Sequence, residues 1–282
     1  MRAMKRLFAA LAAAAVAAAG CTTNPITGRS QLTGLVSEQE AISGSAQAYR
    51  QMMADLDKKK QIERTSGDKE SPRVKKVQEI TDRLIAQAVK FRPDSAGWRW
   101  EVQVINDPKT VNAFCMAGGK MAIYTGMWEQ VKVTDDELAQ VMGHEISHAL
   151  LDHTRERMSL ARSTSLGVQV LAAATGVGSL GGQAMDTAAQ LALTLPNSRE
   201  SEAEADNVGT QLAAHAGYDP RAAAALWDKM AKLGGGQLEF LSTHPSPENR
   251  AAKLKELAFK LEPVYVAAKA NPPAAQRYVN LK

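Results

Sequence analysis

Five consecutive residues near the middle of the chain, His144-Glu145-Ile146-Ser147-His148, have the types and spacing of a hydrolytic zinc site. Residues four apart in a helix share one face, so both imidazoles can bind one ion. Glu145 then lies beside the ion, where its carboxylate can take a proton from a zinc-bound water attacking a carbonyl. It can afterwards protonate the leaving amine. The pattern predicts a peptide-bond hydrolase with one Zn²⁺ per chain and Glu145 as the catalytic base.

The helix that carries this motif is predicted to begin near Thr134. Thr134 and Glu137 have the spacing of a capping box, and acidic residues in the first turn favour the positive end of the helix dipole. We expect the helix to run to about Arg162. Apolar residues recur along one side of it, namely Leu138, Val141, Met142, Ile146 and Ala149. A helix with such a side is expected to be buried, whereas a chance HExxH would be expected in a solvated helix.

A catalytic zinc site needs a third protein ligand, which the same helix does not supply. Leu151 and Thr154 stand where the extended motif HExxHxxGxxH has glycine and histidine. About 55 residues after the motif, Glu202 and Asp206 are again four apart and share one face of a predicted helix. The alternative is an acidic, solvated start of a helix. That description suits two neighbouring residues, Glu200 and Glu204.

The segments HEISHALLDHTRERMS and SRESEAEADNVG together resemble peptidase family M48. The resemblance implies that Glu202 is the third zinc ligand beside His144 and His148, and that Asp206 orients a ligand imidazole. It also implies protein quality control in the bacterial envelope. Unfolded or misfolded outer-membrane proteins would be the substrates, and the outer-membrane assembly machinery is among the partners that it suggests.

Further segments extend the resemblance over nearly the whole chain. Residues 22–29 resemble the start of mature lipoprotein members, and Asn112-Ala113-Phe114 with Gly118-Gly119 matches a strand pair ahead of the zinc helix. Ser242-Thr243-His244-Pro245 with Arg250 matches a late motif. The implied fold class is α+β, a mostly helical zincin-like domain with a small β-sheet ahead of the HExxH helix.

His244 is the remaining candidate for the catalytic site. Two roles are open to it: donating a hydrogen bond to the oxyanion of a tetrahedral intermediate, or occupying the open zinc position in a resting form. The alternative is a loop histidine that caps a turn before Pro245. His153 is expected to be structural, because it follows His148 by five residues and does not share the ligand face, and His215 is expected to be structural because it lies near a helix end.

The N-terminus has the pattern of an export signal. A basic start precedes an apolar run over residues 7–19, which is too short to span a bilayer comfortably. Small residues just before Cys21 resemble a bacterial lipobox, and the alternative is an ordinary cleaved signal with Cys21 incidental. We therefore predict three parts: a lipoprotein signal peptide over 1–20, a lipidated tether over 21–36 and the peptidase domain over 37–282. A threonine after the cysteine is typical of outer-membrane lipoproteins facing the periplasm, anchored through the lipid.

Composition is that of an ordinary globular protein, with 45% hydrophobic and 23% charged residues in 282. The net charge of +4 depends on the N-terminus, since removing the first 20 residues leaves 31 basic and 30 acidic side chains. No basic block with interleaved aromatics follows, so we expect no nucleic-acid partner. If Cys21 is acylated, Cys115 has no partner for a disulfide.

Two expectations concern substrate access. Zincins usually bind substrate as an added strand, and we take residues 119–125 as the sheet edge that would receive it. Residues 163–195 are rich in glycine and small residues, so they are predicted either to form a lid over the cleft or to be a plain helical hairpin. The alternative function is a periplasmic chaperone or assembly factor on a zincin scaffold with weak or gated proteolysis. A pure binding protein, however, has no need of Glu145.

Overall fold

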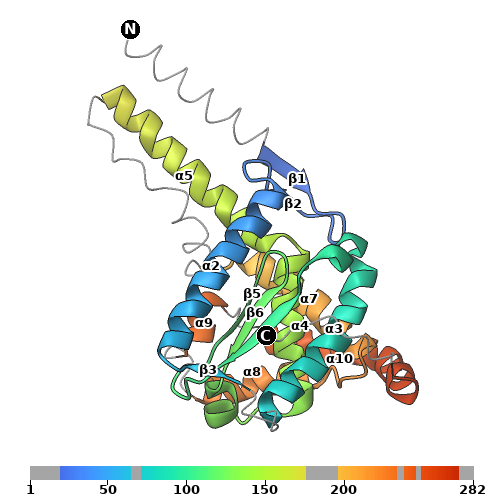
Figure 1. Cartoon of the computed structure of the whole chain (residues 1–282). Coiled ribbons are helices and arrows are strands. Elements are labelled where there is room, and N and C mark those ends of the chain that lie inside the picture. Colours follow the sequence, from blue (N-terminus) through green and yellow to red (C-terminus); the bar gives the residue numbers. More distant parts are fainter. Residues whose placement is uncertain (1–19, 65–70, 176–195, 234–237, 246–248, 273–282) are drawn as a thin grey trace.

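The structure is a computed structural model that describes residues 20–64, 71–175, 196–233, 238–245 and 249–272, without the side chains of 166–175 (Figure 1). The described strands are β1 (Cys21–Thr23), β2 (Ser30–Leu32), β3 (Ile62–Glu63), β4 (Glu101–Ile105), β5 (Ala113–Met116) and β6 (Lys120–Tyr124). The described α-helices are α2 (Glu38–Lys58), α3 (Pro72–Phe91), α4 (Asp135–Leu150), α5 (His153–Thr175), α7 (Arg199–His215), α8 (Ala222–Lys232), α9 (Glu239–Thr243) and α10 (Arg250–Ala270). The α+β, mostly helical class with a small sheet ahead of the HExxH helix is confirmed.

Four strands form one mixed sheet in the order β3-β4-β6-β5. The hairpin predicted around Gly118 and Gly119 is present: β5 pairs antiparallel with β6, and both glycines have the positive φ values that its turn requires. On its other side β6 pairs in parallel with β4. The prediction that residues 119–125 form the substrate-binding edge is therefore wrong, because β6 has a neighbour on each side. Among the described residues, the strands at the two edges of the sheet are β3 and β5.

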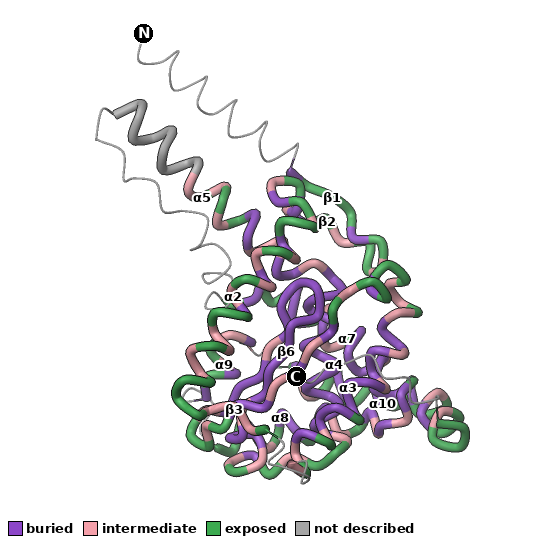
Figure 2. Tube along the Cα trace, in the orientation of Figure 1, coloured by how far each residue is buried: buried purple, intermediate pink, exposed green. Residues whose placement is uncertain are grey.

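The two faces of this sheet are covered by different helices (Figure 1). Tyr49 of α2 donates a hydrogen bond of 2.8 Å to the carbonyl oxygen of Met121, and its ring meets that of Phe114 edge to face. On the opposite face, alternate side chains of the sheet join α3 and α4 in the main hydrophobic core: Val102, Val104, Ala113, Cys115, Met121 and Ile123. Figure 2 shows this burial concentrated along β6 and α4, so the motif helix lies at the centre of the fold.

The motif helix begins as predicted and ends earlier than predicted. Thr134 caps α4, and the capping box with Glu137 is formed. The expected continuation to Arg162 is wrong, because Asp152 adopts a left-handed φ of 58° and separates α4 from α5. The free carbonyl oxygen of Leu151 accepts hydrogen bonds from the side chains of Asn24 and Gln31. This break depends on a partner 127 residues away in the sequence, which no local pattern shows.

Helix α7 crosses α4 at a pair of glycines. A Cβ atom on Gly209 would lie 2.7 Å from the backbone nitrogen of His144, and one on Gly143 would lie 2.7 Å from the carbonyl oxygen of Gly209. The two backbones are therefore in direct contact. Helix α7 starts after Ser198, whose side chain accepts from the N–H of Ser201, and it ends before a glycine with positive φ.

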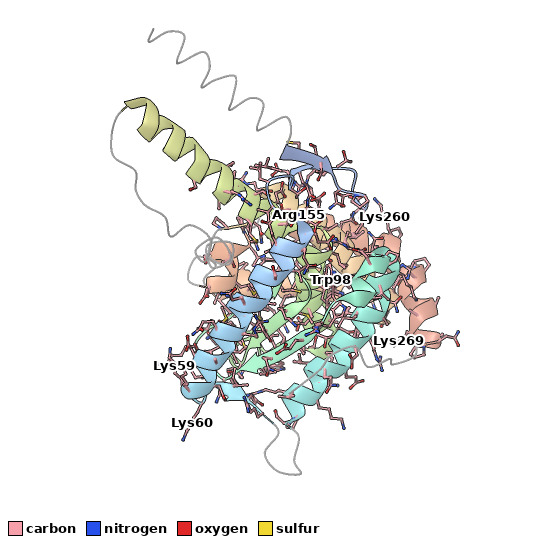
Figure 3. All side chains as sticks on the ribbon, turned by 45° about the horizontal axis from the view of Figure 1, so that its top comes forward. Lys59, Lys60, Trp98, Arg155, Lys260 and Lys269 are labelled. Carbon is pink, nitrogen blue, oxygen red and sulfur yellow. The ribbon has the colours of Figure 1, made fainter. Side chains whose placement is uncertain are left out.

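The segment predicted as a tether, 21–36, is folded against the domain. Strands β1 and β2 pair with each other, and Asn24 is buried at 3% exposure. Arg155 of α5, which is labelled in Figure 3, donates to the carbonyl oxygen of Val36 at the end of the segment. The segment is thus part of the domain surface rather than a free linker.

Two predicted regions fall partly or wholly outside the described residues. Residues 1–19, most of the predicted signal peptide, are outside them, and so are residues 176–195 of the predicted lid. The first part of that lid region, 163–175, continues α5 as a single helix. Within the described chain, no helix combines the length and the apolar character needed to span a membrane.

We predict that Gly209→Ala destabilises the protein, because its methyl group would push α7 away from α4. The free energy of unfolding should fall by about 1–3 kcal/mol, the usual effect of overpacking a core. Urea unfolding of Gly209→Ala and of Asn207→Ala, at an exposed position of the same helix, measures the difference. Equal stabilities of the two variants would show that the contact tolerates a methyl group.

Candidate metal centre and catalytic cleft

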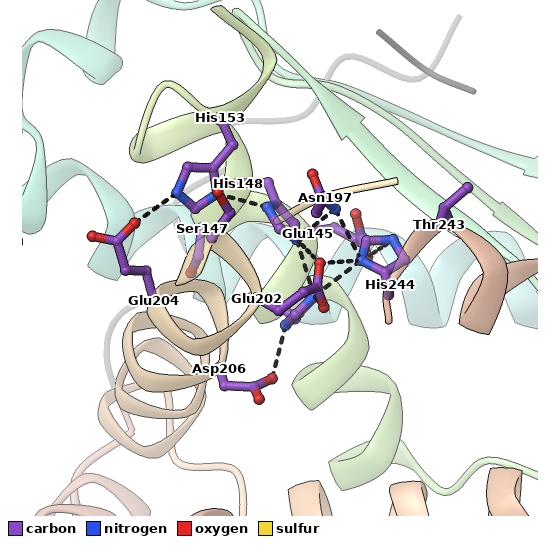
Figure 4. Close-up of polar contacts among 12 residues, drawn as sticks. Glu145, Ser147, His148, His153, Asn197, Glu202, Glu204, Asp206, Thr243 and His244 are labelled. Carbon is purple, nitrogen blue, oxygen red and sulfur yellow. Dashed lines mark hydrogen bonds and ion pairs between the residues drawn. The ribbon is translucent and has the colours of Figure 1, made fainter. Parts of the chain in front are cut away.

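Helix α4 places His144 and His148 one turn apart on the side that faces α7. Both side chains are buried, with exposures of 6% and 2%, and their Nε2 atoms are 3.0 Å apart (Figure 4). Their rings meet edge to face with centroids 4.7 Å apart. The two nitrogens therefore converge on one point, as the spacing predicted.

Glu202 of α7 completes this point from the other side. Its Oε1 lies 3.3 Å from Nε2 of His148, and its Oε2 lies 3.4 Å from Nε2 of His144. The side chain has no exposed surface. The structure thus brings together the three residues that the sequence analysis assigned to the metal.

His244, which follows α9, contributes a fourth donor atom to the same cluster. Its Nδ1 lies 2.9 Å from Oε1 of Glu202 and 3.3 Å from Nε2 of His144. The four donor atoms all lie within 4.8 Å of one another. Four ligands held about 2.1 Å from a tetrahedral zinc ion are about 3.4 Å apart, so the separations fit zinc. Three imidazoles and one carboxylate are also ligand types that zinc prefers.

The electrostatics of the cluster favour a cation. Burial alone would lower the pKa of His144, but the carboxylates of Glu202 and Asp206 raise it to about 9. Burial alone would raise the pKa of Glu202, yet His244 and His144 hold it well below its usual range. Burial keeps the pKa of His148 well below its usual value, which leaves its imidazole neutral. The same field that attracts a proton to His144 attracts a metal ion.

Glu145 lies next to the donor cluster without joining it. Its Oε1 is 3.4 Å from Nε2 of His244, and the residue is 2% exposed. Burial raises the pKa of its carboxyl group above the usual range, although His244 and His144 oppose the shift. A raised pKa makes the carboxylate a stronger base near neutral pH.

A cleft of about 410 Å³ opens beside these residues. The edge strand β5 forms one wall of it, and Glu145, His148 and His244 form the reactive end. Further along, the cleft is bordered by Tyr124 and Glu239. Within the described part of the chain, the arrangement places the edge strand β5 and the carboxylate of Glu145 on one cavity.

Arg250 connects two carboxylates behind the cluster. Its Nη2 lies 2.6 Å from Oδ1 of Asp206 and its Nη1 lies 3.1 Å from Oε2 of Glu202. Its guanidinium stacks over the ring of Trp227, 3.5 Å from the centroid. Oδ1 of Asp206 is also 3.1 Å from Nδ1 of His144, although not in the orientation of a well-formed hydrogen bond. Asp206 therefore lies where the sequence analysis expected a residue orienting an imidazole.

Two residues of the site, Asn197 and Arg157, cannot be recognised from the sequence. Nδ2 of Asn197 is 3.4 Å from Nε2 of His148 and 3.3 Å from Nδ1 of His244, and its Oδ1 accepts from the guanidinium of Arg157. Arg157 borders the cleft, where desolvation lowers its pKa to about 10. The positions of these two residues in the sequence match no catalytic or metal-binding motif. Their contacts in the site form between segments that are far apart in the sequence.

His153 and Glu204 are nearer to the centre than the sequence suggested. Nδ1 of His153 is 2.7 Å from Nδ1 of His148, and its Nε2 is 3.1 Å from Oε2 of Glu204. Burial would raise the pKa of Glu204, but hydrogen bonds from His153, Thr27 and Arg29 lower it to about 2. Its side chain is 13% exposed, so its description as part of a solvated helix start is wrong.

A buried helix that presents two imidazoles four residues apart, a carboxylate from a second helix and a free glutamate beside them defines an HExxH metallopeptidase site. The sequence profile of Peptidase family M48 matches residues 71–258, more than half of the chain. The chain belongs to this family. Metallopeptidases of the family use zinc, in agreement with the donor set.

Similar proteins carry the names of metallopeptidases. Mitochondrial metalloendopeptidase OMA1 of Arabidopsis thaliana is 40% identical over 161 residues, which cover 57% of this chain and 32% of that protein. Metalloprotease LoiP of Escherichia coli K12 is 34% identical over 52% of this chain and 59% of its own length. Metalloprotease YcaL of the same organism is 26% identical over 89% of this chain and 96% of its own. The aligned part spans between a third and a half of the OMA1 proteins of Arabidopsis and two yeasts.

We predict that Glu145→Gln abolishes peptide cleavage and retains the metal, because the amide cannot accept the proton of water. The cleavage rate should fall at least about 100-fold, the lower limit of the usual effect of a general base. Zinc content and peptide cleavage should be measured together, with Glu200→Gln at an exposed position as the matched control. Cleavage at an unchanged rate by Glu145→Gln would remove Glu145 from the base role.

Proposed function

We propose that this chain is a zinc-dependent endopeptidase that cuts unfolded or misfolded polypeptides in the bacterial envelope. The observation that carries the proposal is the position of Glu145, which is buried beside the donor cluster of His144, His148 and Glu202 and lines the same cleft. Membership of family M48 supports the reaction class.

The residues divide the chemistry among them. Zinc, when bound, polarises the scissile carbonyl and lowers the pKa of a water molecule. Glu145 takes the proton of that water during attack and returns it to the leaving amine. His244 can donate an N–H hydrogen bond from Nε2 to the oxyanion, because that atom lies 3.4 Å from Oε1 of Glu145.

His244 also has a second role in the proposal. With its Nδ1 among the donor atoms, it would fill the position that a zinc peptidase keeps open for substrate. Asn197 contacts both His244 and His148, and its backbone N–H donates to the carbonyl oxygen of Thr243. Withdrawal of His244 would therefore break its contact with Asn197.

Unfolded chains are the substrate class that the site geometry favours. Glu145 and His244 are only 2% and 4% exposed, so a loop of a folded protein cannot reach them unless that loop unfolds. An extended chain can pair with β5, which has a strand neighbour on one side only among the described residues. Main-chain pairing makes little demand on sequence, which suits an enzyme of protein quality control.

Attachment to the outer membrane, facing the periplasm, is part of the proposal. It is supported by the lipobox-like sequence before Cys21 and by the exposure of Cys21 at the start of β1. Such a location would bring stalled outer-membrane proteins, and the machinery that assembles them, within range. The chaperone alternative has no use for a buried carboxylate beside the metal ligands.

Digestion of one protein in two states tests the substrate class. The purified full chain with zinc should cut reduced, alkylated ribonuclease at least about tenfold faster than native ribonuclease, because only the unfolded chain can enter the cleft as a strand. A chelator should stop both reactions. Equal rates for the two states would refute the preference, and intact substrate in the presence of the zinc-loaded protein would favour the chaperone alternative.

Lipidation can be tested on the cell fraction and on the residue itself. Cells fed labelled palmitate should label the wild-type chain and the Cys115→Ala variant, whereas Cys21→Ser should be unlabelled. Cys21→Ser should also leave the membrane fraction, since attachment depends on the acyl chains. A labelled Cys21→Ser variant would place the modification elsewhere.

A further inference from the structure

We propose that Arg29 is a positioning residue for the metal ligand His148, acting from the N-terminal segment through Glu204 and His153. The proposal rests on the metal centre described above. The family profile begins at residue 71, so Arg29 lies outside the part of the chain that it matches. The segment that follows Cys21 would then be a working part of the active site.

An unbroken series of hydrogen bonds joins Arg29 to the ligand. Nε of Arg29 donates to Oε2 of Glu204 over 2.7 Å, and the same oxygen lies 3.1 Å from Nε2 of His153. Nδ1 of His153 lies 2.7 Å from Nδ1 of His148. The far nitrogen of His148, Nε2, is the atom that faces the donor cluster. Figure 4 shows the part of this series from Glu204 to His148.

The series determines which nitrogen of His148 carries a proton. A carboxylate can only accept, so Nε2 of His153 must donate to Glu204. Nδ1 of a neutral His153 is then an acceptor, and Nδ1–H of His148 must be its donor. This leaves the lone pair of His148 on Nε2, the tautomer that can bind a metal. In the other tautomer a proton on Nε2 would point at the cluster.

Arg29 is fixed by more contacts than a simple counter-ion needs. Its two terminal nitrogens lie 2.8 and 2.6 Å from the two carboxylate oxygens of Glu156, while Nε binds Glu204. The planar guanidinium therefore bridges α5 and α7 with three charge-assisted hydrogen bonds. Lysine has a single charged nitrogen and cannot reproduce this geometry.

The backbone of the N-terminal segment holds Arg29 in place. The N–H of Asn24 donates to the carbonyl oxygen of Arg29 over 2.8 Å, and the N–H of Gly28 donates to the carbonyl oxygen of Asn24 over 2.9 Å. Gly28 has a φ of 74°, which closes the turn. The side chain of Asn24 is buried and donates to the carbonyl oxygen of Leu151, between the two helices that carry His148 and His153. The segment is thus built onto the end of the metal-binding helix.

The simpler alternative is that Arg29 only clamps α5 to α7. A clamp would alter stability and leave the metal affinity of the folded protein unchanged. A positioning residue changes metal affinity, and does so through His153. Removing a hydrogen-bond partner of a metal ligand typically costs about 10–100-fold in affinity, which is well within measurement.

The test uses the full-length protein and measures zinc affinity by competition with a chromophoric chelator, with thermal unfolding of the metal-free protein as a parallel readout. The variants are Arg29→Gln, Arg29→Lys, His153→Phe and the double variant Arg29→Gln/His153→Phe. Arg221→Gln is the matched control, since it breaks an ion pair with Asp219 on a side chain that is 67% exposed. The visible spectrum of the cobalt-substituted protein reports on ligand geometry independently.

We expect Arg29→Gln and His153→Phe each to weaken zinc binding about 10–100-fold, and the double variant to be no weaker than His153→Phe alone. Arg29→Lys should fall between Arg29→Gln and wild type, and Arg221→Gln should match wild type. Zinc affinity of Arg29→Gln within twofold of wild type, or effects that multiply in the double variant, would overturn the proposal. A wild-type chain that binds no zinc would instead refute the metal centre itself, and the present proposal with it.

Discussion

The direct contact of two helix backbones is the constraint on which the rest of the site depends. Gly143 and Gly209 allow α4 and α7 to approach so closely that neither can carry a methyl group at the crossing. At this distance the carboxylate of Glu202 reaches both His144 and His148, with its oxygens 3.4 and 3.3 Å from their Nε2 atoms. Several elements pack directly against this pair: β5, α3 and α8 against α4, and α10 against α7.

The close packing of α4 and α7 buries carboxylate side chains, and arginine side chains compensate their negative charge. Three carboxylates, those of Glu145, Glu202 and Asp206, lie in or beside a region with little solvent, where an unpaired charge costs several kcal/mol. Arg250 compensates from behind and Arg157 from the cleft. A metal ion held by the donor atoms of the cluster would add a further positive charge to this region. Metal binding and the stability of this packed region are therefore linked.

Local sequence predicted those parts of the structure that local interactions determine. The capping box at Thr134, the hairpin at Gly118-Gly119 and the start of α7 after Ser198 each depend on residues two to four positions apart. The positions of His144, His148 and Glu202 followed from helical periodicity together with the family motif. The order of the strands did not follow, because the parallel pairing of β4 with β6 skips the intervening strand β5. The contacts of Asn197, Arg157 and Glu204 also could not be predicted from local sequence, because their partners lie 40 or more residues away.

Because residues 21–33 are folded onto the domain, an N-terminal lipid anchor would restrict how the domain moves relative to the membrane. Cys21 opens β1, and Asn24, three residues later, is already fixed to the end of the metal-binding helix. If acyl chains are attached to Cys21, no flexible linker remains between the bilayer and the catalytic domain. The catalytic domain would then be unable to move away from the membrane on a flexible linker. It would sit at the membrane with limited rotational freedom, and it would encounter those chains that emerge within about one domain diameter of the lipid surface.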